Sequence, residues 1–397
     1  MCAGVSKRIA AVVFIGMLCL VFLKSGSYME IRRLAELLRQ DAEASESEDV
    51  LTMDRLETEF SSGLWKQRML LELNGWMGKR LHMQGFYSGM GIYVTDDNYI
   101  VSASDSTSTD YEYEELLSLK HFLDENGIGL LYVNEPTKYV DDDFFREEFG
   151  VETYSNRNMD RFLMRIREAG VPAIDLRDNI RKEGLNVRDL FYRTDHHWTT
   201  RAGLWAVRII AEGLNTYCGY SVDTSVYDES NYNFTEWNAC WLGEQGRKLS
   251  QAYVGLDDYT EIKPNFATSY TFFGSEGAYE GTFDRFINEE VYNPENSVYE
   301  NKSWHYSYNQ ISCINHNAAS GKVLLLGDSY EQVTEPFLSL GVREIDALIL
   351  RNYDDSFHLR DYILEKGYDT VLICYAQFML GAHDNEASAN YRMFCFE

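Results

Sequence analysis

Two short segments of this sequence hold the residue types that nucleophilic catalysis requires. One is Asp195–Trp198, which reads Asp-His-His-Trp, and the other is Gly327–Ser329, which follows an apolar run. A carboxylate two residues from a histidine can turn back within a loop, orient the imidazole and fix its tautomer. Such a histidine can take the proton of a serine hydroxyl, which then attacks an acyl carbonyl. The two segments therefore predict a triad of Ser329 as nucleophile, His197 as general base and Asp195 as its orienting acid.

The surroundings of Ser329 are those of a strand that leads directly into a helix. Val323–Leu326 is apolar throughout, as in a strand buried on both faces, and helical sequence follows from Tyr330 to Leu340. Free backbone N–H groups at the start of such a helix can stabilise an oxyanion, and Gly327 permits a tight backbone approach. Because Ser and Asp also commonly cap helices, this segment alone is equally compatible with a structural role.

The Asp-His-His-Trp segment is predicted to lie in a loop between a strand and a helix that Thr199 caps. Its alternative interpretation is a buried histidine pair beside a structural tryptophan. Both segments are then expected at strand-to-helix switch points of an α/β sheet, where the carboxyl ends of the strands form ligand sites. Their combination favours the catalytic interpretation.

Alternating helix and strand patterns predict an α/β fold with a parallel sheet and covering helices. Helices are expected over residues 111–126, 156–169, 199–214, 330–340 and 357–366, and strands over residues 128–133, 171–176, 323–326, 345–350 and 370–375. Residues 221–320 are rich in Tyr, Asn, Gly and Asp, and we expect them to form an irregular insertion of loops and strands.

The N-terminal region predicts a membrane anchor. Lys7 and Arg8 precede an apolar run of 15 residues, Ile9–Leu23, and no small-x-small cleavage site follows it. An uncleaved signal-anchor is therefore favoured over a cleaved signal peptide, with the N-terminus in the cytoplasm and the bulk of the chain on the extracellular face. The predicted organisation is a cytoplasmic tip and anchor helix over residues 1–28, a charged helical stalk over 29–55 and a catalytic domain over 56–397.

Composition restricts the possible partners and cofactors. The formal net charge of −27 argues against binding to nucleic acid, because such a surface repels phosphates. The seven cysteines include no Cys-x-x-Cys pair, which argues against a zinc site, and we predict no metal or other cofactor. A disulfide between Cys218 and Cys240 stays open, although most cysteines outside the anchor are expected to be small buried hydrophobes.

The two segments also carry a family resemblance. Asp195–Trp198 is the signature that names the bacterial DHHW family, and together with Gly-Asp-Ser329 it resembles the alginate O-acetyltransferase group (AlgX/AlgJ-like) of SGNH-type proteins. The resemblance covers about residues 85–397. Further matching pieces are Asp97–Ile100, Pro136–Lys138 and Leu350–Arg351. It implies an SGNH-hydrolase-like fold in which the Asp and the His precede the Ser, with the same three roles for Asp195, His197 and Ser329.

The resemblance further implies an oxyanion hole, for which SGNH enzymes use a glycine and an asparagine besides the serine N–H. This sequence has no secure match to either residue. Gly243 or Gly246 could supply a backbone N–H, and Asn134 could supply a side chain after a predicted strand. Gln377, after the last predicted strand, is a fourth candidate.

Together with the anchor, the resemblance implies an extracytoplasmic polysaccharide O-acyltransferase, with acetyl as the expected group, that works through an acyl-serine intermediate. Its partners would be a polysaccharide acceptor and a membrane-bound protein that passes acyl groups outward, because acetyl-CoA is cytoplasmic. Two alternatives stay open: a secreted or anchored carbohydrate esterase (deacetylase) with the same triad, and a non-catalytic glycan-binding or scaffold protein. A two-metal phosphoesterase of the DHH type is disfavoured, because Asp141–Asp143 is the only further acidic cluster that such chemistry could use.

Overall fold

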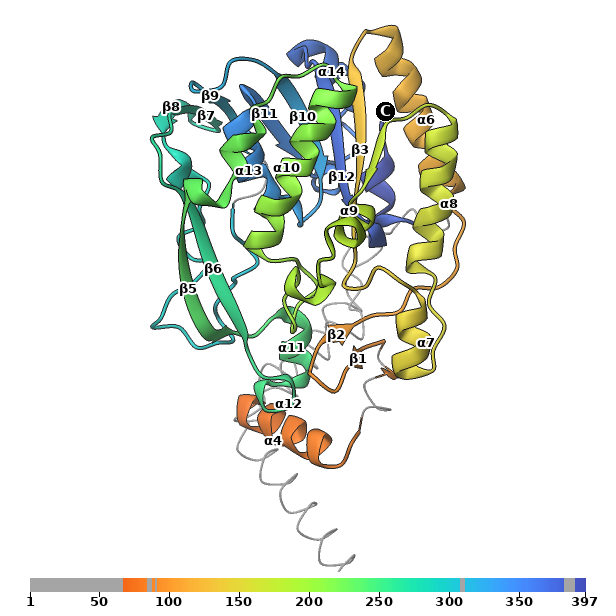
Figure 1. Cartoon of the computed structure of the whole chain (residues 1–397), viewed down its shortest axis with the longest axis vertical. Coiled ribbons are helices and arrows are strands. Elements are labelled where there is room, and N and C mark those ends of the chain that lie inside the picture. Colours follow the sequence, from red (N-terminus) through yellow and green to blue (C-terminus); the bar gives the residue numbers. More distant parts are fainter. Residues whose placement is uncertain (1–66, 84–87, 90, 308–310, 382–389) are drawn as a thin grey trace, which may run out of the picture. The chain divides into compact units, whose positions relative to one another are not determined.

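The computed structural model of the chain describes residues 67–83, 88–89, 91–307, 311–381 and 390–397 (Figure 1). The chain divides into two compact units, Met1–Leu81 and His82–Glu397. In the first unit the described element is helix α4 (Gln67–Arg80). The predicted anchor, the stalk and the predicted domain start at residue 56 lie outside the described residues. Within the described residues, no helix is both long enough and apolar enough to cross a membrane.

Eight strands of the second unit form one mixed sheet, in the order β4-β3-β12-β10-β11-β9-β7-β8. The first five run parallel, and the last three extend the sheet in antiparallel fashion. The parallel strands confirm the predicted α/β class. The sheet is mixed, however, whereas a parallel sheet was predicted. The bounds are β3 Gly129–Glu135, β4 Ala173–Asp175, β7 Tyr270–Gly274, β8 Gly277–Gly281, β9 Ser312–Asn315, β10 Lys322–Gly327, β11 Glu344–Leu348 and β12 Thr370–Ala376.

The antiparallel strands belong to the segment 221–320, which is more regular than the predicted insertion. Its first part is a hairpin of β5 (Tyr232–Trp241) and β6 (Asp257–Pro264), with the short helices α11 (Glu244–Leu249) and α12 (Gln251–Val254) between them. In its second part, the buried side chains of Tyr270 and Phe272 alternate with more exposed neighbours, as in a strand with one face on a core. The aromatic residues of this segment therefore build the sheet edge as well as loops.

Helices cover both faces of the sheet and confirm the five predicted helices within a few residues at each end. Helices α6 (Asp110–Glu125), α8 (Ser155–Glu168) and α14 (Leu359–Lys366) pack on one face. Helices α9 (Leu176–Glu183), α10 (Thr200–Tyr217) and α13 (Glu331–Gly341) pack on the other. The remaining described elements are β1 Tyr93–Val94, β2 Ile100–Val101, α7 Asp143–Phe149 and 3-10 turns at 187–189, 224–227, 229–231, 283–285, 350–352, 377–379 and 391–394.

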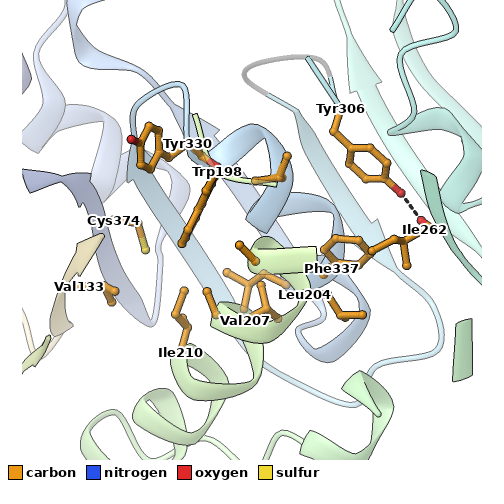
Figure 2. Close-up of a cluster of buried hydrophobic side chains, with 14 of the residues drawn as sticks. Val133, Trp198, Leu204, Val207, Ile210, Ile262, Tyr306, Tyr330, Phe337 and Cys374 are labelled. Carbon is orange, nitrogen blue, oxygen red and sulfur yellow. Dashed lines mark hydrogen bonds between the residues drawn. The ribbon is translucent and has the colours of Figure 1, made fainter. Parts of the chain in front are cut away.

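The larger core lies between the sheet and the α10–α13 pair, which pack side by side (Figure 1). Figure 2 shows Leu204 and Val207 of α10 in this core with Phe337 of α13. Burial of each such side chain stabilises the fold by about 1.5–3 kcal/mol. The two helices approach closely at Gly203, because a Cβ there would lie 2.3 Å from the carbonyl oxygen of Val333.

All five cysteines of the described region are free thiols. The possible disulfide between Cys218 and Cys240 is not formed. Cys240, Cys313 and Cys374 are buried, in agreement with the expectation that they act as small hydrophobes.

Three acidic side chains are buried where β3 and β10 end and α13 begins: Glu135, Asp328 and Glu331. Asp328 accepts hydrogen bonds from the N–H groups of Tyr330 (2.8 Å) and Ala376 (2.7 Å). Within the described part of the chain, neither oxygen of Glu135 or of Glu331 has a hydrogen-bond partner. Burial raises the pKa of Glu331 well above its ordinary value, and the nearby acids, Asp328 among them, raise it further. Glu331 therefore keeps its proton in the folded protein at neutral pH.

We predict that Glu331→Gln stabilises the protein in a pH-dependent way. Above the ordinary pKa of a glutamate, the unfolded chain releases this proton whereas the folded chain retains it, so the free energy of unfolding falls as the pH rises. Glutamine does not titrate, so the variant lacks this fall in the free energy of unfolding with rising pH. At pH 8 the Tm of the variant should exceed that of the wild type by on the order of 2 °C or more, and at pH 4 the two should agree.

The control is Glu365→Gln on the exposed face of α14, which should leave Tm unchanged at both pH values. A Tm difference for Glu331→Gln of equal size at pH 4 and pH 8 would show that Glu331 does not hold a proton that the unfolded chain loses.

Candidate active site

Ser329 lies where predicted, at the carboxyl end of β10 and directly before α13. The other segment differs from its prediction, because no regular strand precedes Asp195. Instead, an isolated bridge between Phe191 and Trp198 closes the turn that carries Asp195 and His197. The predicted helix cap is confirmed, since Thr199 Oγ1 accepts a hydrogen bond from the N–H of Ala202 at 3.2 Å.

The structure brings the three predicted triad residues together. His197 Nε2 lies 2.8 Å from Ser329 Oγ, and His197 Nδ1 lies 2.6 Å from Asp195 Oδ1. The backbone N–H of His197 also donates to Asp195 Oδ1, at 3.0 Å. With Nδ1–H donating to the carboxylate, Nε2 carries the lone pair that faces the serine hydroxyl. This is the geometry that a general base and a nucleophile require.

The carboxylate of Asp195 is completely buried and nevertheless ionised. Burial raises its pKa, but the hydrogen bond from His197 and the neighbouring histidines lower it more, so the pKa of Asp195 stays well below its ordinary value. Its second oxygen accepts a hydrogen bond of 2.7 Å from the backbone N–H of Glu244, the first residue of α11. The segment 221–320 therefore contributes directly to the site.

Two further side chains hold the turn in place, and sequence reasoning did not find either role. Asp257, at the start of β6, accepts hydrogen bonds from the N–H groups of Arg193 (2.7 Å) and Thr194 (2.9 Å). Lys138, from the Pro136–Lys138 piece of the family pattern, donates from Nζ to the carbonyl oxygens of Asp195 (2.7 Å) and Arg193 (3.0 Å). Burial lowers the pKa of Lys138 to about 7.

The two glycines predicted as oxyanion donors serve a different purpose. The N–H of Gly243 donates to Thr194 Oγ1 at 2.7 Å, and that of Gly246 donates to the Thr194 carbonyl oxygen at 2.8 Å. A Cβ on Gly243 would lie 2.5 Å from Asp195 Cβ, and a Cβ on Gly246 would lie 2.7 Å from Thr194 Cβ. Both glycines thus allow α11 to approach the turn of Asp195, and their N–H groups are not available to an oxyanion.

The two side chains predicted as oxyanion donors also have other partners. Asn134 is buried and donates from Nδ2 to Asp175 at 2.9 Å. Gln377 donates from Nε2 to Ser155 Oγ at 2.7 Å. By contrast, the backbone N–H of Ser329 has no hydrogen-bond partner among the residues that the structure describes, and it is the donor best placed for an oxyanion.

Aromatic rings fix the orientation of His197. Trp304 stacks on the imidazole of His197 with ring centroids 4.0 Å apart and planes 5° apart. Trp198, the last residue of the signature, donates from Nε1 to the carbonyl oxygen of Tyr330 at 2.9 Å and stacks on the Tyr330 ring. Trp198 thereby ties the histidine turn to the serine turn. Nothing in the sequence around Trp304 indicated that it would reach the site.

His196, the middle residue of the signature, faces a hollow beside the triad. Its ring contacts that of His197 at 3.8 Å between centroids, and its carbonyl oxygen accepts a hydrogen bond of 2.5 Å from the Tyr330 hydroxyl. Burial, together with the neighbouring His197, lowers the pKa of His196 to about 3. His196 is therefore neutral at physiological pH.

Asp195, His196 and His197 are also the group of potential metal ligands that the described residues bring together. However, both oxygens of Asp195 accept N–H hydrogen bonds, and both ring nitrogens of His197 have partners. The arrangement is complete as a hydrogen-bonded triad, and we propose no metal there.

Comparison with known families gives a match over part of the chain, which includes Asp195 and His197. Residues 93–234 match the family model described as "SGNH hydrolase-like domain, acetyltransferase AlgX". The match confirms the predicted resemblance to SGNH-type proteins of the AlgX group. A search of curated protein sequences found no significant match.

Solved structures share the fold over most of the chain. Bacillus cereus PatB1, in a structure with a sulfonyl adduct, aligns with a TM-score of 0.61 and 20% identity over 77% of this chain and 98% of that one. A DHHW family protein from Eubacterium siraeum aligns with a TM-score of 0.53 and 14% identity over 74% of this chain and 91% of that one. At these identities the likeness establishes a common fold.

We predict that Asp195→Asn slows the reaction of Ser329 with an activated ester by about 10³–10⁴-fold, because the amide favours the wrong imidazole tautomer. Stopped-flow release of nitrophenol from p-nitrophenyl acetate measures this rate. The matched control is Asp361→Asn on the exposed face of α14, which should react like the wild type. A rate for Asp195→Asn within tenfold of the wild type would exclude the orienting role of Asp195.

Proposed function

We propose that this protein is an extracytoplasmic O-acyltransferase that moves an acyl group, acetyl in the simplest case, onto a polysaccharide through an acyl-Ser329 intermediate. The observation that carries the proposal is the contact of 2.8 Å between His197 Nε2 and Ser329 Oγ, backed by an ionised Asp195. The match of residues 93–234 to an acetyltransferase domain supports the choice of acetyl and of transfer.

In the first half of the reaction, the acyl group passes from the donor to Ser329. The hydroxyl proton of Ser329 passes to Nε2 of His197 while Oγ attacks the acyl carbonyl of the donor. The leaving group of the donor takes this proton as its bond to the carbonyl breaks, which leaves an ester on Ser329. Asp195 stabilises the imidazolium that forms between these steps.

In the second half, the acyl group passes from Ser329 to a sugar, and His197 again transfers the proton. A sugar hydroxyl gives its proton to His197 Nε2 and attacks the ester carbonyl, and the bond to Ser329 Oγ then breaks. Oγ takes the proton back, and the O-acylated sugar is released. In both halves the negative charge develops beside the Ser329 N–H, at the N-terminal end of α13, where helix dipole and free N–H favour it.

A carbohydrate esterase with the same triad is the second candidate, because water in place of the sugar hydroxyl gives hydrolysis. A non-catalytic scaffold is less well supported, since the triad is assembled with hydrogen-bonding distances throughout.

The sulfonyl adduct in the PatB1 structure suggests sulfonyl fluorides as a class of reagent with which to probe Ser329.

The test of this proposal offers the full chain an activated acetyl ester together with a pool of oligosaccharides. We expect mass spectrometry to detect acetyl on the peptide that contains Ser329 and on the sugars. Both products should be lost by several orders of magnitude in Ser329→Ala and kept in Ser275→Ala, an exposed serine in the β7–β8 turn.

The outcomes separate the candidates. Acetylated enzyme without acetylated sugar, with acetate released instead, would favour the esterase. Absence of acetyl on Ser329, with substantial sugar acetylation in Ser329→Ala, would overturn the assignment of the nucleophile.

The membrane location is part of this proposal, together with a membrane-bound partner that supplies the acyl group from the cytoplasmic side. The apolar run of residues 9–23 supports it. Helix α4 adds support, because Met69, Leu73, Trp76 and Met77 are all at least 39% exposed and their spacing places them on one helical face. With Lys79 and Arg80 in its last turn, such a helix suits the surface of a bilayer.

We predict that Trp76 enters the bilayer interface. With the full chain in vesicles, brominated lipid should quench part of the tryptophan fluorescence, and Trp76→Phe should remove most of this quenching. The matched variant Trp205→Phe, on α10, should leave the quenching unchanged. Equal quenching in Trp76→Phe and the wild type would show that α4 does not lie on the membrane.

A further inference from the structure

A hollow of about 200 Å³ opens beside the triad on the side of His196. Its aromatic lining comes from His196, Tyr330, Phe378 and Tyr139. Phe378 packs edge-on against His196 and Tyr330, with ring centroids 5.8 and 5.7 Å apart. Because Tyr330 and His196 adjoin Ser329 and His197 in the chain, a ligand in this hollow lies next to the reacting groups.

A second hollow of about 270 Å³ continues from the first. The two share Ser104 and Phe378 as lining residues and therefore adjoin one another, and we term the pair the Ser104 groove. It leads from His196 to Gly381. The second hollow is lined by hydroxyl and amide side chains, among them Ser106, Thr107, Asn158 and Gln377.

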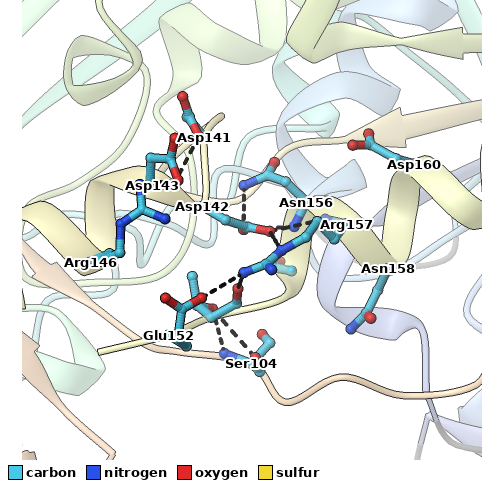
Figure 3. Close-up of polar contacts among 12 residues, drawn as sticks. Ser104, Asp141, Asp142, Asp143, Arg146, Glu152, Asn156, Arg157, Asn158 and Asp160 are labelled. Carbon is cyan, nitrogen blue, oxygen red and sulfur yellow. Dashed lines mark hydrogen bonds and ion pairs between the residues drawn. The ribbon is translucent and has the colours of Figure 1, made fainter. Parts of the chain in front are cut away.

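The wall of the Ser104 groove is held rigidly by α8 and the turn before it. Ser104 donates from its N–H to Thr153 Oγ1 at 2.9 Å and accepts from the Tyr154 N–H at 2.8 Å. Asn158 donates from Nδ2 to the carbonyl oxygen of Asp105 at 2.8 Å. Figure 3 shows Ser104 below the start of α8, where Asp142 accepts hydrogen bonds from Asn156 and Arg157. The groove is therefore formed before any ligand binds.

The chemistry of this lining fits a chain of sugars. Hydroxyl and amide groups of the protein can exchange hydrogen bonds with sugar hydroxyls, and an aromatic side chain offers an apolar surface for a sugar ring. The aromatic side chains lie at the end of the groove beside the triad, and the hydroxyl and amide side chains lie farther from it. Gln377, which sequence reasoning considered for the oxyanion hole, lies in this wall instead.

The charges of the groove point to an uncharged sugar chain. Among the lining residues that the structure describes, Asp105 and Lys138 are the charged ones. Asp105 is exposed, whereas Lys138 is buried with Nζ on two carbonyl oxygens. Arg161, outside the lining, donates to the Thr107 carbonyl oxygen and to Asn158. In a chain of net charge −27, a uronic acid polymer would meet the Asp105 carboxylate, and the described lining residues offer no cation that is free to pair with the polymer.

We propose that the acceptor lies in the Ser104 groove and is a stretch of uncharged sugars, with one ring over Phe378 and further hydroxyls facing Ser104, Ser106 and Thr107. This inference rests on the proposed function and names the class of acceptor that the site takes. The groove selects neutral glycans against polyuronates.

The test measures binding by calorimetry to the full chain carrying Ser329→Ala, so that no turnover interferes. The probes are a tetramer of N-acetylglucosamine, which is uncharged, and a tetramer of galacturonic acid. We expect the uronate to bind at least about tenfold more weakly at low salt. Adding Ser106→Trp, which fills the groove, should weaken the neutral tetramer by at least about tenfold, whereas Ser275→Trp on the β7–β8 turn should not.

A further variant guards against loss of binding through misfolding. Asp105→Lys should increase the affinity for the uronate, a gain that a damaged protein cannot show. Equal or tighter binding of the uronate by the parent protein, unchanged binding in Ser106→Trp, or no binding of the neutral tetramer would each overturn this inference. Acetylation of Ser329 by the activated ester is measured separately on the wild-type chain, so the proposed function can stand where the groove assignment fails.

Discussion

The buried negative charge of Asp195 is the constraint on which the site depends. A carboxylate without contact to water is stable only where hydrogen-bond donors replace the water. Here the donors are the ring and the backbone N–H of His197 and the backbone N–H of Glu244. Glu244 belongs to the segment between the two halves of the parallel sheet, so this segment completes the site. Lys138 and Asp257 hold the same turn from two other parts of the chain, through hydrogen bonds to its backbone carbonyl and N–H groups.

The sequence was sufficient to predict the parts of the fold that follow from local patterns. Continuous apolar runs such as Val323–Leu326 indicated strands buried on both faces, and the alternation of helix and strand patterns indicated the α/β class. The triad was predictable because each of its segments carries its chemistry within four residues. The antiparallel strands β7 to β9 were not, since they are short and one of them, β8, is largely exposed, so that its pattern resembles that of a loop.

The oxyanion candidates show where sequence reasoning ends. A glycine indicates that something approaches the backbone closely, but it does not indicate what approaches. At Gly243 and Gly246 the approaching group is the turn of Thr194 and Asp195 and not a substrate. A polar residue after a strand is similarly ambiguous. Asn134 and Gln377 both follow strands of the sheet, yet one supports a buried ion pair and the other lies in the wall of the groove.

The rings around His197 have a consequence for the order of events. The indole of Trp304 covers one face of the imidazole, the ring of His196 packs against it as well, and Nδ1 is committed to Asp195. Only the edge that carries Nε2 is left for proton transfer. In the proposed transfer reaction, donor and acceptor would therefore use the same small space in turn, and the spent donor would have to leave before a sugar could enter. The proposed function therefore implies ping-pong kinetics, in which a high concentration of either substrate inhibits the half-reaction of the other.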